Sequence, residues 1–401
     1  MVDIAHQAAI NPASRDAATA RARVPLASID PGQWRALAQR ATEPNGYYLP
    51  AWELAVSATA RGRNDASALA AFGGSSARLI GLMPVISLWR ALKIPLPALV
   101  SAHPYGTLCS PLIDRDAATE AAACLLQQAR KAGAHALVLN DVALDGAAMN
   151  TIKQVLDCDG LKPRVLSSYI RASLDATQDG ETLLRDALGT KKLKDLRRQR
   201  HRLAEHGPVA FDVARKPDEI RPALEIFLQL EASGWKGKRG TALIQHAGDA
   251  TFIRRAVPAL AETAQCEIVT LRAGTTPVAA GIVLRHQDRA FFFKLGIDER
   301  FAKYSPGVQL TLDLTRHLCA DPAIASADST ASADHPMINP IWRGRFAIGD
   351  VLIPLRRNDP IVALIRAALA TCYASRETAR SVVHLIRKWR TTNPRQTAQQ
   401  A

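Results

Sequence analysis

Acidic and histidine side chains follow an expected strand that ends at Ala327. Asp328 comes directly after this strand, and Asp334 and His335 follow in a polar loop. General acid–base catalysis needs a side chain that can take a proton from a reacting group or give one to it. A histidine beside an aspartate has the chemistry of such a base, so Asp328, Asp334 and His335 are candidate catalytic residues. The same Asp-His-Pro order is also typical of a helix N-cap, and both interpretations stay open.

A helix start near residue 305 is the second candidate feature. Residues 290–297 are aromatic and apolar, which is typical of a buried strand, and a Ser-Pro-Gly sequence then favours a helix. Backbone N–H groups in a first helical turn and the helix dipole favour an anion, usually phosphate. A plain strand–turn–helix connection has the same pattern. The candidate cofactor-binding residues are Ser305, Gly307, Val308, Gln309 and Leu310.

Basic and aromatic side chains gather in a glycine-rich loop at residues 234–240. Trp235, Lys236 and Arg239 are expected to cover an acceptor, with the indole stacked on a ring, and Lys294 is the one charge in the strand 290–297. We therefore take these four as candidate substrate-binding residues. A mobile surface loop is the alternative for residues 234–240, but an exposed tryptophan favours the functional interpretation.

Several classes of protein are excluded by what the sequence lacks. It has no GxSxG of a hydrolase, no GxxxxGK[ST] and no GxGxxG, and its six cysteines form no CxxC pair, so we expect no metal and reduced thiols in the cytoplasm. No apolar run reaches the roughly 18 residues of a membrane span. Residues 1–25 have no apolar core of a secretory signal and are expected to form a flexible tail.

The net charge of +14 is concentrated in two places. Residues 191–202 carry seven basic residues and one acid in an expected helix, and a second basic run lies in the amphipathic segment 357–401. The helix is expected to bind CoA phosphates, an acidic polymer or tRNA, or to present a solvated basic face. Few aromatic residues interleave with it, so base stacking is not indicated. The tail is expected to cap the domain or to contact a membrane surface or a partner protein.

The order of expected elements repeats along the chain. A hairpin around residues 67–88 and another around 267–285 are alike and about 200 residues apart, which favours duplication of one α/β unit. We expect an α/β (α+β) fold of two tandem units, each a mixed, mainly antiparallel sheet flanked by helices. The units are 26–178 and 179–356, and a helical tail follows. The donor is expected in the second unit.

The chain resembles the CelD-type acetyltransferases associated with bacterial cellulose biosynthesis, which carry a double acyl-CoA N-acyltransferase (GNAT-like) fold. The resemblance covers roughly residues 26–355. It rests on Trp34, Leu37, the run Leu79 to Pro84, Leu196 to Arg198, Leu203, Gly207, Leu230 to Trp235, Tyr304 to Gly307, Asp334 to Ile338, and Trp342. The architecture is also similar to that of Fem-type aminoacyl transferases, which use charged tRNA in place of acyl-CoA.

The resemblance implies an acyl-CoA-dependent N-acyltransferase, with acetyl-CoA as co-substrate and a sugar or polysaccharide precursor, or another amine- or hydroxyl-bearing small molecule, as acceptor. A tRNA-dependent transferase and a non-catalytic binding module in exopolysaccharide synthesis are the alternatives. One motif departs from the single-domain family, whose phosphate turn is Q/R-x-x-G-x-G/A. Here the turn is Lys303 to Gly307, with one glycine and a proline that removes an amide.

Overall fold

The computed structural model describes residues 22–62, 66–74, 77–102 and 104–375. The two expected tails lie largely outside these ranges. The elements of the N-terminal half are β1 (Val24–Pro25), α2 (Pro31–Gln39), α3 (Pro50–Thr59), β2 (Ser67–Gly73), β3 (Arg78–Ser87), α4 (Leu88–Leu92), β4 (Ala98–Ser101), β5 (Leu112–Ile113), α5 (Ala118–Lys131), β6 (Ala136–Ala143), α6 (Ala147–Cys158) and β7 (Arg164–Asp175).

The C-terminal half repeats much of this order. Its elements are α7 (Gly180–Leu203), β8 (Val209–Ala214), α8 (Pro217–Ser233), α9 (Trp235–Lys238), α10 (Ala247–Ala261), β9 (Cys266–Ala273), β10 (Thr276–His286), β11 (Arg289–Ile297), α11 (Pro306–Cys319), β12 (Ser326–Asp328) and β13 (Gly344–Pro354). A further helix covers residues 360–375. The two expected hairpins are present as β2–β3 and β9–β10.

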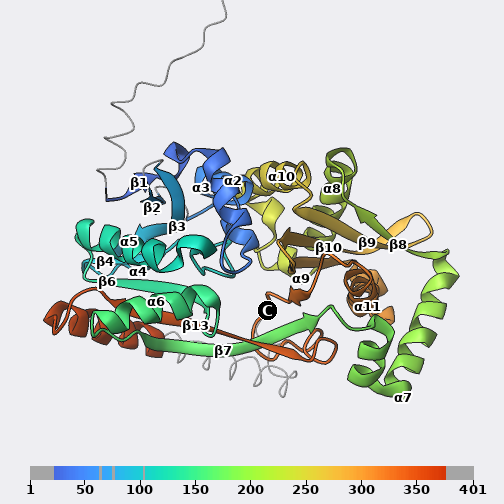
Figure 1. The fold of residues 1–401 in the computed structure, drawn as a ribbon. Coiled ribbons are helices and arrows are strands. Elements are labelled where there is room, and N and C mark those ends of the chain that lie inside the picture. Colours follow the sequence, from blue (N-terminus) through green and yellow to red (C-terminus); the bar gives the residue numbers. More distant parts are fainter. Residues whose placement is uncertain (1–21, 63–65, 75–76, 103, 376–401) are drawn as a thin grey trace, which may run out of the picture.

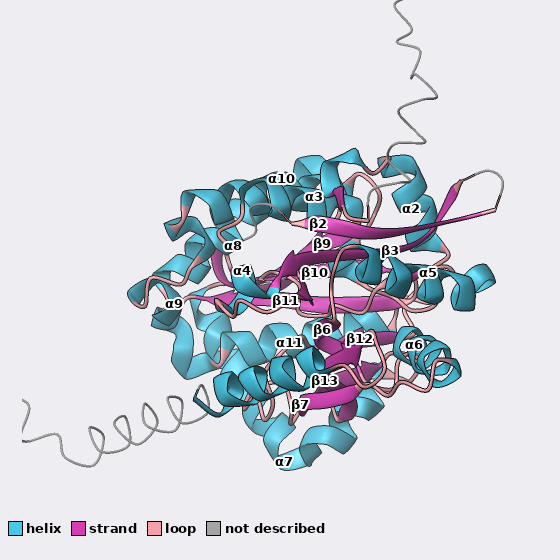
Figure 2. Ribbon diagram, turned by 90° about the vertical axis from the view of Figure 1, so that its left-hand side faces the viewer, coloured by secondary structure: helices cyan, strands magenta, loops and turns pink. Residues whose placement is uncertain are grey.

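Within the described residues the strands form one mixed sheet. Its order is β1-β2-β3-β4-β6-β13-β7-β12-β11-β10-β9-β8, with β5 beside β3. Each half contributes one parallel pair, β4–β6 and β11–β12, and the other described pairs are antiparallel. Helices lie on both sides of the strands (Figure 2). The prediction of a mixed, mainly antiparallel sheet flanked by helices is confirmed.

The two halves exchange strands where their sheets meet. β13 lies between β6 and β7, and β7 pairs on its other side with β12. In Figure 1, β7 runs beneath both halves. The division into units 26–178 and 179–356 stays a prediction. The boundary between the two units falls between β7 and α7. β13 of the second unit lies between β6 and β7 of the first, and β7 of the first unit pairs with β12 of the second.

Aromatic packing joins the halves above the sheet. Trp52 of α3 meets Phe252 of α10 and Phe293 of β11, with ring centroids 4.9 and 4.8 Å apart and nearly perpendicular rings. Edge-to-face pairs of this kind add about 0.5–1.5 kcal/mol each beyond the burial of their area. The main apolar core therefore runs through both halves.

His286 at the end of β10 ties the second half to residues 38–45 of the first. Its Nδ1 accepts the Asn45 N–H at 2.8 Å, and its Nε2 donates to the Ala38 carbonyl at 3.0 Å. Burial lowers the pKa of His286 from 6.5 to about 4. A second proton on the ring would point at the Asn45 N–H, so the folded protein holds this imidazole neutral.

We expect the free energy of unfolding to fall as the pH drops from 6.5 towards 4. In that window the unfolded chain binds a proton at His286 that the folded chain excludes, so acid favours the unfolded state. The loss between pH 7 and pH 5 should be roughly 2 kcal/mol. Urea unfolding of wild type and His286→Gln at both pH values measures it, with the exposed His201→Gln as control. Equal pH dependence in wild type and His286→Gln would contradict the expectation.

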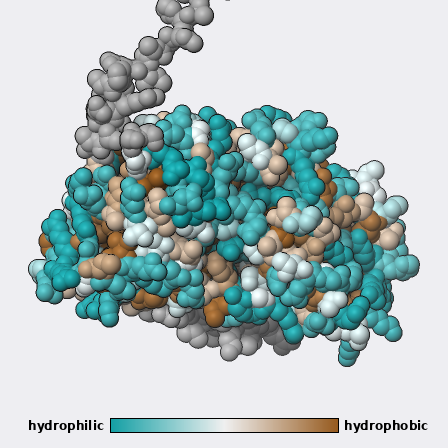
Figure 3. Space-filling view, in the orientation of Figure 1, coloured by the Kyte–Doolittle hydropathy of each residue, from teal (hydrophilic) through white to brown (hydrophobic). Residues whose placement is uncertain are grey.

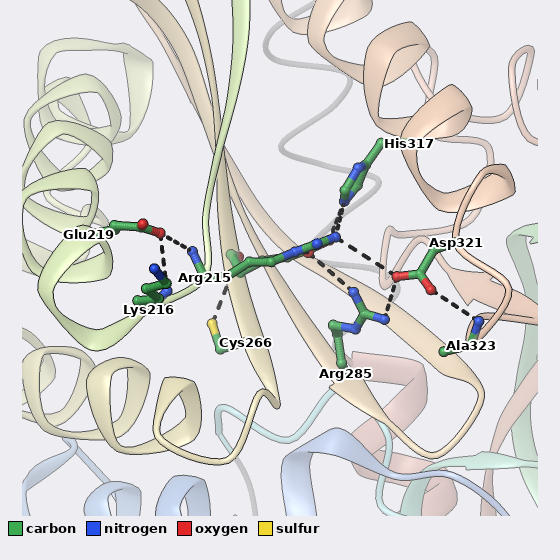
Figure 4. Close-up of polar contacts among 9 residues, drawn as sticks. Arg215, Lys216, Glu219, Cys266, Arg285, His317, Asp321 and Ala323 are labelled. Atoms are coloured by element: carbon green, nitrogen blue, oxygen red, sulfur yellow. Dashed lines mark hydrogen bonds and ion pairs between the residues drawn. The ribbon is translucent and has the colours of Figure 1, made fainter.

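A charge network around a buried glutamate holds α11 to the C-terminal strands. Glu267 of β9 accepts from Arg215 at 3.1 Å, from Arg285 at 3.3 Å and from His317 of α11 at 3.1 Å, and Asp321 accepts from Arg285 at 2.6 Å (Figure 4). The Glu267 side chain is fully buried, and its three basic partners hold its pKa below its usual range despite burial. Because its carboxylate is paired on both oxygens, we assign this network a structural role.

The helix at residues 360–375 covers the N-terminal half. Ile365 and Leu369 are buried against Ile86 and Val138. This part of the expected tail therefore caps the fold, and the membrane or partner contact expected for the rest falls on residues outside the described ranges. Among the described residues, none of the helices has the length and apolar character needed to cross a membrane.

Candidate active site

A pocket of about 640 Å³ opens where β11 and β12 part. The two strands pair over three residues, ending at Phe291 and Asp328. Both halves build its wall, which consists of Arg61, Pro104, Tyr105 and Thr107 from the first half, Lys236, residues 292–295 and Ile297 from the second, and Ser329, Thr330, Ala331, His335, Met337 and Ile338 from the loop after β12. We call it the β11–β12 pocket. Its volume suits a small-molecule ligand.

Two of the candidate substrate residues meet in this pocket around a buried glutamate. Glu231 accepts from Lys236 at 3.1 Å and from Lys294 at 3.3 Å on one oxygen, and from the Leu243 N–H at 2.9 Å on the other. Burial and the charge of Lys294 lower the pKa of Lys236. Two ammonium groups against one carboxylate leave the wall with a positive charge, which favours an anionic ligand.

Glu231 was missed at the sequence level, although one signal was present. It stands on α8 in step with the buried Ile220, Leu224 and Phe227, at the spacing of one helix face. A carboxylate on an apolar helix face must find cationic or hydrogen-bonding partners, because an unpaired buried charge is costly. Here the partners are the pocket lysines, which Glu231 holds in place.

His335 lies in the wall of the pocket, and Asp334 is exposed. Burial, with a smaller effect of the Lys236 charge, lowers the pKa of His335, which keeps its ring neutral near pH 7. Its Nδ1 accepts the Met337 N–H at 3.3 Å. The neutral ring therefore carries its proton on Nε2, where it can donate a hydrogen bond. The expected pairing with Asp334 does not appear among the hydrogen bonds of the described residues.

Asp328 is committed to a buried ion pair beneath the pocket. Arg171 of β7 donates to it at 2.5 Å, and both side chains are 1% exposed. Its other oxygen accepts the Thr330 N–H at 2.8 Å. Arg171 also donates to the carbonyl of Thr107 in the pocket wall at 2.7 Å. Because both of its oxygens are engaged, Asp328 is no longer a candidate base, and we infer that its ion pair positions the pocket wall.

Two buried hydroxyls near the pocket make no well-formed hydrogen bond within the described residues. They are the Thr107 Oγ1 and the Tyr47 hydroxyl, and Thr107 lines the pocket. Burial raises the pKa of Tyr47, so its phenol stays protonated. The two hydroxyls are close enough to interact with each other, and a polar ligand atom beside Thr107 would give its hydroxyl a hydrogen bond. An acyl carbonyl and an anionic carrier therefore suit this wall. No sequence signal marked either residue.

The predicted helix start forms, but fewer of its amides are free than expected. Ser305 is the N-cap of α11 in a left-handed conformation (φ 55°), and its side chain makes no capping bond. Its carbonyl accepts the Gln309 N–H at 3.0 Å, and the Gln309 side chain donates to the Leu196 carbonyl at 2.8 Å. Gln309 is therefore engaged in structure, and Leu310 is buried in the core. Gly307 and Val308 remain as candidate anion donors beside the pocket.

Gly307 allows α11 to approach the pocket wall closely. A Cβ there would lie 3.0 Å from Leu295, 3.3 Å from Ile297 and 3.3 Å from Met337, all of which line the β11–β12 pocket. The glycine thus sets the packing of this wall, a role that the sequence did not indicate.

We expect Gly307→Val to destabilise the protein by roughly 1–3 kcal/mol, because the added atoms overpack this wall. Urea unfolding measures this loss, and calorimetry should show weaker binding of an acyl donor. Thr119→Val, at an exposed position of the first turn of α5, is the control for adding valine to a helix start. Unchanged stability in Gly307→Val would show that the contacts relax without cost.

The other two candidate substrate residues are placed differently. Arg239 is exposed beyond α9 and does not line the pocket. Trp235 begins α9, but its side chain lies outside what the structure describes, so its predicted stacking stays a prediction.

The predicted basic helix is α7, which bends at Gly189. Leu193, Leu196 and Leu203 are buried along it. Within residues 191–202, its exposed lysines and arginines without an ion-pair partner in the described part of the chain are Lys191, Lys192, Lys194, Arg197 and Arg202. α7 packs on α11 and on the turn at residues 299–304 beside the helix start. Figure 3 shows hydrophilic side chains at the end of the molecule where Figure 1 places α7.

Comparison with known proteins identifies the segment that builds most of this site. Residues 190–335 match the family model described as an acetyltransferase (GNAT) domain. This segment of the chain is similar to GNAT acetyltransferase domains. This confirms the prediction of an acyltransferase. The matched residues include Lys236, Lys294 and His335. No curated protein matches the chain in sequence.

Solved structures share the fold of nearly the whole chain. FemX is 12% identical with a TM-score of 0.56, covering 84% of this chain and 98% of its own. The C-terminal domain of a protein described as a lysylphosphatidylglycerol synthetase, from Agrobacterium fabrum, is 13% identical with a TM-score of 0.52, covering 85% and 95%. L-PGS from Bacillus licheniformis is 13% identical with a TM-score of 0.51, covering 85% and 97%. At these identities the likeness shows the fold alone.

Proposed function

We propose that the chain transfers an acyl group from acyl-CoA to an amine, with the donor bound in the β11–β12 pocket. The supporting observation is the positively charged pocket at the parting of β11 and β12, most of whose lining residues, Lys236 and Lys294 included, belong to the segment that matches the acetyltransferase domain. Lys236 and Lys294 suit the anionic part of the donor, and acetyl-CoA is the first candidate. Among the described residues, no cluster could hold a metal ion.

The residues of the pocket divide the chemistry between them. The amine nitrogen attacks the acyl carbonyl carbon, the new C–N bond forms and the thioester C–S bond breaks, while a proton passes from the amine to the departing thiolate. The Thr107 hydroxyl and the His335 Nε2–H are the candidate donors to the carbonyl oxygen, where negative charge develops. Glu231 and the Arg171–Asp328 pair fix the positions of the lysines and of Thr107.

Aminoacyl-tRNA is the second candidate donor, and the surface of α7 favours it. Five exposed cations without partners in the described chain lie on a helix that packs beside the helix start at the pocket. Such a surface suits a polyanion longer than CoA. The resemblance to Fem-type transferases, which use charged tRNA, points the same way. Both donors present an acyl carbonyl joined to a phosphate-bearing carrier, so the pocket chemistry is shared.

The acceptor that the CelD-type resemblance suggests is a sugar or polysaccharide precursor with a free amine, and we propose the cytoplasm as the place where it meets the donor. Calorimetry with acetyl-CoA and with charged tRNA separates the candidates. Acetyl-CoA binding at micromolar to millimolar concentration that is weakened by Lys294→Met supports the first donor. Binding of tRNA alone, falling steeply with salt, supports the second. Binding of neither, or binding without turnover, would overturn the proposal in favour of a non-catalytic module.

A further inference from the structure

A second cavity, of about 790 Å³, lies at the other parallel strand pair. β4 and β6 pair over three residues ending at Val100 and Val138, and beyond them the Asn140 N–H bonds to the Ser101 hydroxyl at 2.8 Å. We call this the β4–β6 pocket. It occupies the same place in the first half that the β11–β12 pocket occupies in the second, because each opens where the parallel pair of its half parts.

The charge of the β4–β6 pocket is opposite to that of the β11–β12 pocket. No lysine, arginine or histidine is among its described lining residues, which include two carboxylates, Asp141 and Asp350. Asp350 stands at an irregularity of β13 between β6 and β7, where the ladder is interrupted. Such bulges redirect side chains and are frequent beside functional sites.

The two carboxylates have different hydrogen-bond environments. Asp350 is saturated: it accepts the Asp141 N–H at 3.0 Å on one oxygen, and the hydroxyls of Ser167 at 3.0 Å and Tyr373 at 2.7 Å on the other. Asp141 accepts the Tyr169 hydroxyl at 3.1 Å on Oδ1. Within the described residues its Oδ2 has no hydrogen-bond donor.

Within the described residues, no lysine, arginine or histidine forms an ion pair with Asp141. The positive charge that reaches it belongs to Arg171, which is itself paired with Asp328. Burial and the neighbouring Asp350 raise the pKa of Asp141 to about 6. The wall therefore carries two carboxyl groups and, among its described lining residues, no cation, an arrangement that a bound cation would stabilise.

We propose that the β4–β6 pocket binds the acyl acceptor as a primary ammonium on an apolar chain, with the ammonium on Asp141. The apolar part of the wall, which suits the chain of such a ligand, consists of Ile86, Leu92, Val100 and Leu166. The assignment of this ligand as the acceptor rests on the proposed function. It deepens that function by naming an alkyl amine as the acceptor class, in place of the sugar amine that the CelD-type resemblance suggests, and by dividing the substrates between two pockets of opposite charge.

The two pockets are neighbours through a short chain of contacts. Tyr169, which bonds Asp141, lies two residues before Arg171 on β7, and Arg171 contacts both Asp328 and the carbonyl of Thr107 in the β11–β12 pocket. The loop after β12 lines both cavities, with Ser332 and Ala333 in one and residues 329–331 in the other. This loop is where an amine would pass towards the acyl carbonyl.

Calorimetry with n-hexylammonium, n-hexanol and n-hexanoate tests the site. We expect wild type to bind n-hexylammonium at least tenfold more tightly than the other two probes. Asp141→Asn should lower that affinity at least tenfold, and Asp157→Asn, an exposed aspartate on α6, should leave it unchanged. Equal affinity for the three probes, or a folded Asp141→Asn with wild-type affinity, would overturn the proposal.

A second variant covers the case in which Asp141→Asn does not fold. Ser168→Lys, at an exposed position in the wall, keeps both carboxylates and supplies an internal ammonium, so it should also lower n-hexylammonium affinity at least tenfold. Wild-type affinity in Ser168→Lys would overturn the proposal. Acetyl-CoA and tRNA titrations separate this result from the proposed function. If the protein binds n-hexylammonium through Asp141 but binds neither donor, the cation site stands, and the assignment of its ligand as the acyl acceptor is wrong.

Discussion

Replacing Arg171 by methionine should cost the protein roughly 3–5 kcal/mol of its free energy of unfolding, because it leaves Asp328 as a buried carboxylate without its cation. The two side chains are 1% exposed and 2.5 Å apart. The substitution also removes the hydrogen bond to the Thr107 carbonyl. Urea unfolding monitored by tryptophan fluorescence measures the loss as a shift in midpoint at constant slope.

The double variant Arg171→Met with Asp328→Leu is the control for this expectation. It removes both charges, so no buried carboxylate remains, and much of the lost stability should return. Arg198→Met, which breaks an exposed pair with Asp195, should change stability by less than about 1 kcal/mol. A loss below that value in Arg171→Met, or a double variant no more stable than the single one, would contradict the assigned role.

Lys294→Met should weaken binding of the acyl donor roughly ten- to one-hundred-fold, the value of one hydrogen bond to a charged group. The fold should survive because Lys236 still neutralises Glu231 at 3.1 Å. What is lost is the surplus positive charge of the β11–β12 pocket. Calorimetry with acetyl-CoA, or with tRNA if that proves to be the donor, measures the change.

Lys238→Met is the matched control for Lys294→Met. Lys238 lies on α9 and pairs with Glu299 outside the pocket, with a 70% exposed side chain. The substitution Lys238→Met removes one positive charge near the β11–β12 pocket without changing a residue of the pocket wall. Equal losses in the two variants would mean that the donor responds to general charge rather than to Lys294. Unchanged donor affinity in both variants would show that the donor does not bind in the β11–β12 pocket.

The elements that surround the site could be predicted from local sequence. An apolar run followed by Ser305-Pro306 predicted β11 and α11, and glycine-bearing turns predicted the two hairpins. These features depend on residues close in the chain, whose backbone preferences and side-chain alternation decide the element. Lys236, Lys294 and His335 could be named as candidates from the sequence, because charged side chains next to a strand or glycine-rich loop are visible without a fold.

Only the tertiary structure decided which of these residues act together. Arg171 and Asp328 are 157 residues apart, and they meet because β7 pairs with β12 across the exchanged strands. Thr107 reaches the β11–β12 pocket from the other half of the chain. Pairing between distant strands leaves no local pattern, so neither contact has a sequence signature.

The availability of each group was likewise set by its neighbours. The Gln309 N–H donates to the Ser305 carbonyl. Asp328 forms an ion pair with Arg171, and Glu231 forms ion pairs with two lysines. The same residue types at the same spacing would remain free on a different scaffold. Sequence thus determined the strand–helix frame and the chemical types near it. Long-range pairing and burial decided which charges are compensated and which remain to meet a ligand, because the cost of a buried charge depends on the groups around it.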